Sequence, residues 1–387
     1  MNQDAIRYDA THIQVLEGRE AIRKRPGMYV GSTGERGLRQ LVFEVADRAM
    51  NEIIAGHASS VDVILTPDGG VRVADDGPGV PVEAAGTTGG PGLETLLTRP
   101  RIGPEPGGRH AGVLGHIGMG PCVTNSLSSH LTAEVRREGV RWVQEYARGV
   151  PVTPPTAAGP ATGSGTTIAF RPDADIFGTA EFSFAALAEI FRELALLNRE
   201  LDISLTDERL PGSTRAVRFR FPGGVQDFVA FLEGEAAVPL HPDIVGFERE
   251  DPRMAGTVAV ALRWCDSREE QIRTFANSRP TPEGGTHAEG FRDGVAAAVN
   301  AFARQRGLLT AADPDLGADR IGEGLTAMVS VSLDHPEYGG ATRARLDNAP
   351  ARACVGRAVR EDLGAWLEAR PEQAANVIGR ILQGARA

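Results

Sequence analysis

The sequence predicts an α+β protein in which two units follow one another along the chain. Residues 35–55 carry apolar side chains at helical spacing, and the hairpin pattern VDVILTPDGGVRVADD follows them closely. Strand patterns then lead to a second helical stretch at 183–197. Beyond about residue 220, strands, a long helix and a further strand suggest a βαβ arrangement. Both units therefore combine helices with strands.

In the first unit, an arm with little periodicity precedes a helix that we expect over 16–25, which the Pro26-Gly27 pair ends. Gly56 is a suitable stop for the 35–55 helix. The stretch PVTPPTAAGPATGSG, residues 151–165, is expected to be a mobile loop between strands. The remaining expected elements are a helix at 92–98, a Gly- and Pro-rich segment at 99–120, and strands near 131–137, 141–147 and 165–171.

The second unit has a simpler order of elements. Its expected parts are strands at 256–264, 270–276 and 325–333, a Gly-Gly turn at 284–285, a long helix at 286–304, and two C-terminal helices at about 350–369 and 372–385. The total length of 387 residues suggests two or three domains.

Composition is ordinary for a soluble globular protein, but the formal net charge of −10 argues against a generally basic nucleic-acid surface. Arginine supplies every Lys/Arg cation except Lys24. Cys122, Cys265 and Cys354 are far apart without CxxC spacing, as expected of thiols in a reducing compartment. The N-terminus lacks a signal pattern, and no apolar run approaches membrane-spanning length, so we expect a cytoplasmic protein.

Three short stretches carry side chains suited to a ligand. VADDGPGVP, residues 73–81, ends a strand in two acids, and such a carboxylate can accept a hydrogen bond from an exocyclic amine such as that of adenine. GHIGMG, residues 115–120, precedes a helix and offers backbone N–H groups to a phosphate. GSGTTIAF, residues 163–170, offers a hydroxyl on a strand. Taken singly, these stretches also fit a tight turn, a flexible loop and an ordinary strand.

Their order along the chain resembles the GHKL ATP-binding fold: a helix with Glu44, then DDGxG, then GxxGxG, then GT on a strand. Two longer motifs narrow the resemblance to gyrase B, namely LEGREAIRKRPGMYVGSTGERGL (16–38) and FANSRPTPEGGTHAEGFRDG (275–294). The resemblance implies a dimerisation arm at 1–15, a GHKL (Bergerat) α/β sandwich at 16–218, and a transducer domain of the ribosomal S5 domain 2-like type at 219–387.

The resemblance also assigns roles to residues at an ATP site. It implies that Glu44 is the general base, that Asp75 binds adenine with help from Thr166, and that Arg343 of the transducer turn reaches the γ-phosphate. Glycines at the site are implied to approach the nucleotide closely or to form the lid over its phosphates; they are Gly79, Gly115, Gly118 and Gly120.

The implied partners follow from the N-terminal arm, in which Tyr8 and Ile13 match residues that embrace a second subunit. The resemblance therefore implies a homodimer formed on nucleotide binding. A gyrase-A-like subunit and DNA are implied partners if the chain is part of a longer system, and no membrane is implied.

Several positions depart from the family pattern, and they cluster at the expected chemistry. Gln40 stands where the family has a histidine that orients the base, and Arg48 stands where it has an asparagine that ligates Mg²⁺. Pro78 replaces the arginine of DDGRG. In the transducer turn, Ala341 and Arg343 replace a glutamine and a lysine, although a guanidinium still suits phosphate.

Arg48 is the departure with the largest expected effect. On a helix it shares a face with Glu44 and Glu52, each one turn away. It has no acceptor atom, so it cannot ligate Mg²⁺, and its charge would favour the ionised form of Glu44 and weaken it as a proton acceptor. Two alternatives stay open: Arg48 replaces the metal as the charge that neutralises phosphate oxygens, or it forms only an exposed helical ion pair.

Other charged residues have simpler interpretations. His12, His110 and His116 lack ligand spacing and are expected to be solvated or loop residues. Arg136 and Arg137 fit either the pocket mouth, where the family has an arginine, or a charged strand edge.

Three functions are compatible with these observations. The first is an ATPase and transducer module that couples hydrolysis to dimer closure and DNA strand passage. The second is a short paralogue that binds a nucleotide or an inhibitor with little hydrolysis, as a regulator or resistance protein. The third is a tailoring enzyme that directs ATP to another acceptor. The chain ends at GRILQGARA, where the family continues into a TOPRIM domain, so we expect that this chain alone is not a complete topoisomerase.

Overall fold

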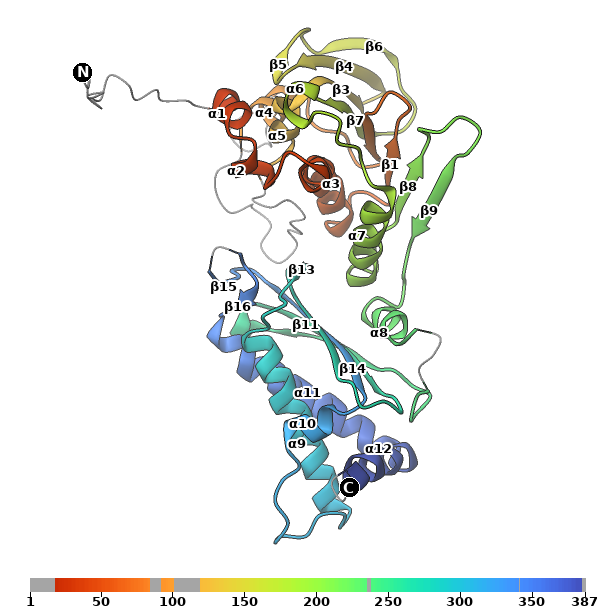
Figure 1. Ribbon diagram of the computed structural model, residues 1–387, viewed down its shortest axis with the longest axis vertical. Coiled ribbons are helices and arrows are strands. Elements are labelled where there is room, and N and C mark those ends of the chain that lie inside the picture. The colour runs from red at the N-terminus through yellow and green to blue at the C-terminus, as the bar shows by residue number, and fades with distance from the viewer. Residues whose placement is uncertain (1–17, 84–91, 101–118, 235–237, 341, 385–387) are drawn as a thin grey trace, which may run out of the picture.

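The computed structural model describes residues 18–83, 92–100, 119–234, 238–340 and 342–384. Figure 1 shows two units stacked along the long axis of the molecule, with the N-terminal unit at the top and the C-terminal unit below. Each unit has its own sheet and its own apolar core.

The first sheet runs in the order β5-β4-β3-β7-β2-β1-β8-β9, and β6 pairs with β4. Its strands are β1 (Val61–Leu65), β2 (Val71–Asp75), β3 (Ser128–Arg137), β4 (Val140–Ala147), β5 (Val150–Pro151), β6 (Thr156–Pro160), β7 (Gly165–Pro172), β8 (Ile203–Asp207) and β9 (Arg215–Phe219). Helices lie on one face of the sheet (Figure 1), because alternate residues of β1 and β2 are buried there. The helices are α1 (Gly18–Lys24), α2 (Gly27–Val30), α3 (Glu35–Ile54), α4 (Leu93–Thr98), α5 (Pro121–Ser126), α6 (Ala174–Phe177) and α7 (Phe184–Leu197).

Most of the expected first-unit elements are confirmed, and three differ. The Pro26-Gly27 pair ends α1 as predicted, but it also begins the short helix α2. The expected loop at 151–165 contains β6, whose five residues are all exposed and therefore show no hydrophobic alternation. The strands β8 and β9 were not predicted, although β8 alternates buried and half-buried residues and pairs in parallel with β1.

The second sheet runs in the order β10-β11-β14-β12-β13. Its strands are β10 (Val245–Asp251), β11 (Gly256–Trp264), β12 (Gln271–Ala276), β13 (Arg279–Pro280) and β14 (Leu325–Leu333), and β15 (Tyr338–Gly339) pairs with β16 (Arg345–Leu346) in a separate ribbon. The helices are α8 (Val225–Glu233), α9 (Thr286–Gln305), α10 (Ala318–Gly322), α11 (Ala349–Ala369) and α12 (Pro371–Gly384), with a 3₁₀ turn at Pro252–Met254.

The predicted βαβ arrangement of the second unit is confirmed, because β12 and β14 pair in parallel and α9 connects them. Helices α9 and α11 pack against each other below the sheet, and α8 lies on the opposite face, toward the first unit (Figure 1). The boundary expected between residues 218 and 219 stays a prediction; β9 ends at Phe219.

Within the described ranges, no helix combines the length and the apolar character needed to cross a membrane.

Candidate functional site

Helix α3 carries a buried polar face on an otherwise apolar helix. Gln40, Glu44 and Asp47 are all buried, with Glu44 only 1% exposed. The amide of Gln40 donates to Glu44 Oε1 at 3.0 Å, and the backbone N–H of Gly120 donates to Glu44 Oε2 at 2.8 Å. A carboxylate with this degree of burial requires such donors. The two contacts bring together three of the residues that the sequence placed at the site.

Asp75 and Thr166 meet across two neighbouring strands. Asp75 is the last residue of β2, and its Cα pairs with that of Thr166 on β7. Asp75 Oδ1 accepts the N–H of Gly77 at 3.0 Å, and Thr166 Oγ1 accepts the N–H of Val80 at 3.0 Å. Both side chains are buried, so this strand end is a preformed polar corner.

The turn after β2 requires glycine at position 79 because of its backbone conformation and a close contact with β3. Gly79 has a left-handed φ of +77°, and a Cβ there would lie 2.6 Å from the carbonyl oxygen of Arg136. Arg137 Nη1 also donates to the carbonyl oxygen of Gly79 at 2.8 Å. Arg137, at the end of β3, therefore stabilises the turn through this hydrogen bond, and its expected place at the pocket mouth stays a prediction.

Gly120 requires glycine because of its conformation. It precedes α5 with a φ of +83°, and no atom would lie within 4 Å of an added Cβ. This backbone conformation directs its N–H to Glu44.

Arg48 contacts a different partner from the one expected. The helical spacing predicted that the charge of Arg48 acts on the carboxylate of Glu44. Arg48 Nη2 instead forms an ion pair with Asp75 Oδ2. The Arg48 side chain is 13% exposed and that of Asp75 is 1% exposed. The interpretation as an exposed Glu44–Arg48 pair is therefore wrong: a long side chain reaches from α3 to the end of β2, which lies beside it in the fold. Among the described residues, Arg48 Nε is buried and has no hydrogen-bond partner.

Two arginines of the second unit, Arg279 and Arg343, interact electrostatically with each other, and Arg279 also interacts with Asp47 of α3. Arg343 is exposed, with a left-handed φ of +55°, in the turn that joins β15 to β16. Burial, with a contribution from the charge of Arg343, lowers the pKa of Arg279 on β13, whereas Tyr338 and Asp47 of α3 oppose this shift. Arg279 was not predicted, because a single arginine in an arginine-rich sequence carries no distinctive signal.

Several expected residues lie outside the described ranges. They are the lid glycines Gly115 and Gly118, Ala341 of the transducer turn, Tyr8 and Ile13 of the arm, and the histidines His12, His110 and His116.

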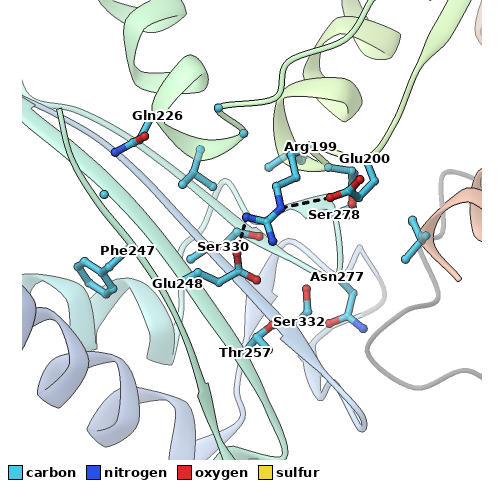
Figure 2. A pocket seen from close by; sticks show the side chains of 18 residues that line it. Arg199, Glu200, Gln226, Phe247, Glu248, Thr257, Asn277, Ser278, Ser330 and Ser332 are labelled. Carbon is cyan, nitrogen blue, oxygen red and sulfur yellow. Dashed lines mark hydrogen bonds and ion pairs between the residues drawn. The ribbon is translucent and has the colours of Figure 1, made fainter. Parts of the chain in front are cut away.

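A separate cavity of about 410 Å³ lies between the two units and is lined by none of the predicted site residues. In Figure 2, Ser330 and Ser332 lie on the sheet side, and Arg199 extends over the cavity toward Glu248. Arg199 Nη1 is 3.7 Å from Glu248 Oε2, and Ser278 Oγ donates to Asn198 Oδ1 at 3.3 Å. These contacts connect Asn198 and Arg199, which follow α7, to residues of the second unit.

The arrangement as a whole matches solved structures. The 43K ATPase domain of Thermus thermophilus gyrase B, solved in complex with an aminocoumarin, superposes with a TM-score of 0.81 and 32% sequence identity, covering 96% of this chain and 95% of that one. The chain belongs to the DNA gyrase B family. The match confirms the predicted α+β fold of a GHKL sandwich followed by a second domain.

Sequence comparisons agree with membership of the gyrase B family. The family model described as DNA gyrase B matches residues 224–387. The gyrase B protein of Streptomyces coelicolor is 41% identical over 98% of this chain, and the novobiocin-sensitive gyrase B protein of Streptomyces niveus is also 41% identical. The chain spans 58% and 59% of the lengths of these two relatives.

Proposed function

We propose that the chain is a gyrase-B-type module that binds ATP beside α3 and the β2–β7 strand end and hydrolyses it with altered use of Mg²⁺. The observation that carries this proposal is the buried Glu44, held by Gln40 and by the N–H of Gly120. In the proposal, Glu44 is the general base, Gln40 orients it, and Arg343 contacts the γ-phosphate. The remaining nucleotide contacts come from Asp75, Gly79, Thr166, Gly120 and the lid glycines Gly115 and Gly118.

The geometry around Glu44 suits a base that must stay oriented. Each of its two carboxylate oxygens accepts a hydrogen bond from a different element, Oε1 from Gln40 of α3 and Oε2 from Gly120 before α5. Two donors on opposite oxygens fix the plane of the carboxylate, so its orientation does not depend on a bound ligand. The amide of Gln40 holds the carboxylate but, unlike the family's histidine, cannot exchange a proton with it near neutral pH.

The residues at the expected metal position do not fit Mg²⁺. A guanidinium has no acceptor atom, and the Arg48 head group is paired with Asp75. The charge that neutralises phosphate oxygens is therefore assigned to arginine side chains, a role that arginine has in other phosphoryl-transfer sites. Arg343 and Arg279 are the candidates on the second unit.

A second candidate function is binding of a nucleotide or an inhibitor with little turnover, in a regulator or resistance protein. The cation at position 48 favours it, because a guanidinium has no acceptor atom for Mg²⁺ and this one is paired with Asp75 rather than with Glu44. One relative, from Streptomyces niveus, is named a novobiocin-resistant gyrase B and is 39% identical to this chain. Dimerisation on nucleotide, and partnership with a gyrase-A-like subunit and DNA, are part of the first proposal and not of the second. No observation favours the third hypothesis, a tailoring enzyme.

The test is ATP turnover measured with and without Mg²⁺ for the native chain, Glu44→Ala and Arg48→Asn. Loss of a general base lowers rates by about 10²–10⁴-fold, so turnover that Glu44→Ala abolishes supports the first function. Binding without turnover, together with a gain of Mg²⁺-dependent turnover in Arg48→Asn, supports the second. Arg171→Asn removes an exposed arginine from another ion pair and serves as the control. Full turnover in Glu44→Ala contradicts the assignment of the base.

A further inference from the structure

The polar corner at the end of β2 contains an acceptor and a donor side by side. Asp75 Oδ1 is bonded to the N–H of Gly77, and Asp75 Oδ2 is paired with Arg48. The formal charges of Asp75 and Arg48 cancel. A carboxylate alone would offer a ligand only acceptors, whereas this pair also offers the N–H groups of a guanidinium.

Arg48 has donors left over after it pairs with Asp75. A guanidinium carries five N–H bonds, and the ion pair is made through Nη2. Nε–H is buried and has no partner among the residues that the structure describes. Because Nε–H is enclosed by the protein, a ligand reaches Arg48 through the 13% of the side chain that stays exposed, and an acceptor brought to that part of the guanidinium gains an interaction that the protein does not supply.

We propose that Arg48 determines base selectivity, so that the proposed ATP site takes purine nucleotides with a carbonyl oxygen at position 6 as well as those with an amine there. This inference rests on the proposed function, in which Asp75 faces the base. An amine at position 6 donates to Asp75. A carbonyl at position 6 accepts from Arg48, while the neighbouring ring N1–H donates to Asp75. Without Arg48, the carbonyl would face a carboxylate and be repelled.

The experiment compares equilibrium binding of ATP and inosine triphosphate, which differ at position 6 and in the N1 proton. The native chain, Arg48→Asn and Arg48→Lys are measured by calorimetry at one salt concentration, and circular dichroism verifies that each variant is folded. We expect the two nucleotides to bind the native chain within about tenfold of each other. In Arg48→Asn, the affinity for inosine triphosphate should fall by about tenfold or more relative to the affinity for ATP, because a charged hydrogen bond to the carbonyl is lost. Arg48→Lys should keep part of the native ratio.

The outcomes separate this inference from the proposed function. If the native chain binds ATP more than about a hundredfold more tightly than inosine triphosphate, the inference is overturned and the proposed ATP site stands. This comparison needs no variant. An equal ratio in the native chain and in folded Arg48→Asn also overturns it. Absence of binding by either nucleotide to the native chain overturns the proposed function itself.

Discussion

The Arg48–Asp75 ion pair is largely buried, and we expect its two charges to be strongly coupled. The two side chains are 13% and 1% exposed, so solvent screens their interaction poorly. With charge centres roughly 4 Å apart and an effective dielectric constant of about 20, their attraction is about 4 kcal/mol. Removing one partner of a buried pair costs about 3–5 kcal/mol. Because the N–H of Gly77 still bonds to Asp75, we expect Arg48→Met to lower the free energy of unfolding by about 3 kcal/mol, the lower end of that range.

The assay is a double-mutant cycle measured by urea unfolding at pH 7.5, with Arg48→Met, Asp75→Asn and the double variant. The double variant removes both charges of the pair, so it should be more stable than the sum of the single losses predicts, by about 2–3 kcal/mol. The matched control is Arg171→Met in the Arg171–Asp68 pair, whose side chains are both 52% exposed. An exposed pair contributes about 0–1 kcal/mol, so this control should change little. A coupling energy below about 0.5 kcal/mol for Arg48 and Asp75 would refute the reasoning.

Three other predictions rest on single sites. Burial lowers the pKa of His287 from 6.5 to about 4, so the unfolded chain binds more protons than the native chain between these pH values. The free energy of unfolding should therefore keep its full value above pH 6.5 and fall by about 3 kcal/mol as the pH approaches 4. Urea unfolding of His287→Asn should lack this loss. Gly79→Ala would place a Cβ 2.6 Å from the carbonyl oxygen of Arg136. It should therefore lower the melting temperature by more than the control Gly139→Ala, at which φ is also +77° but an added Cβ would meet no atom within 4 Å. Equal melting curves for the two variants would exclude the clash. Burial raises the pKa of Cys265 from 9.0 to about 11, so its thiol should react with a disulfide reagent at pH 8 about a hundredfold more slowly in the native than in the unfolded chain, as followed by mass spectrometry.

The motifs that identified the family are continuous in sequence, and this explains why the fold class could be predicted. Residues 16–38 and 275–294 carry long matching patterns, and the hairpin around the Pro-Asp-Gly-Gly turn has both its strands within one short stretch. Elements that depend on distant partners were harder to predict. Strand β6 is exposed throughout and is specified by its pairing with β4, and β8 pairs with β1, more than a hundred residues earlier in the chain.

The sequence by itself determined which residue types stand at the candidate site, including the cation at position 48 and the glutamine at position 40. Only the tertiary structure decided which carboxylate Arg48 contacts. Helical spacing offers Glu44 and Glu52 at equal distance along α3, and neither is the partner in the ion pair. The chosen partner, Asp75, is 27 residues away in sequence and becomes a neighbour because β2 packs beside α3. A long arginine side chain can reach several positions, and the packing of β2 beside α3 decides which carboxylate it meets.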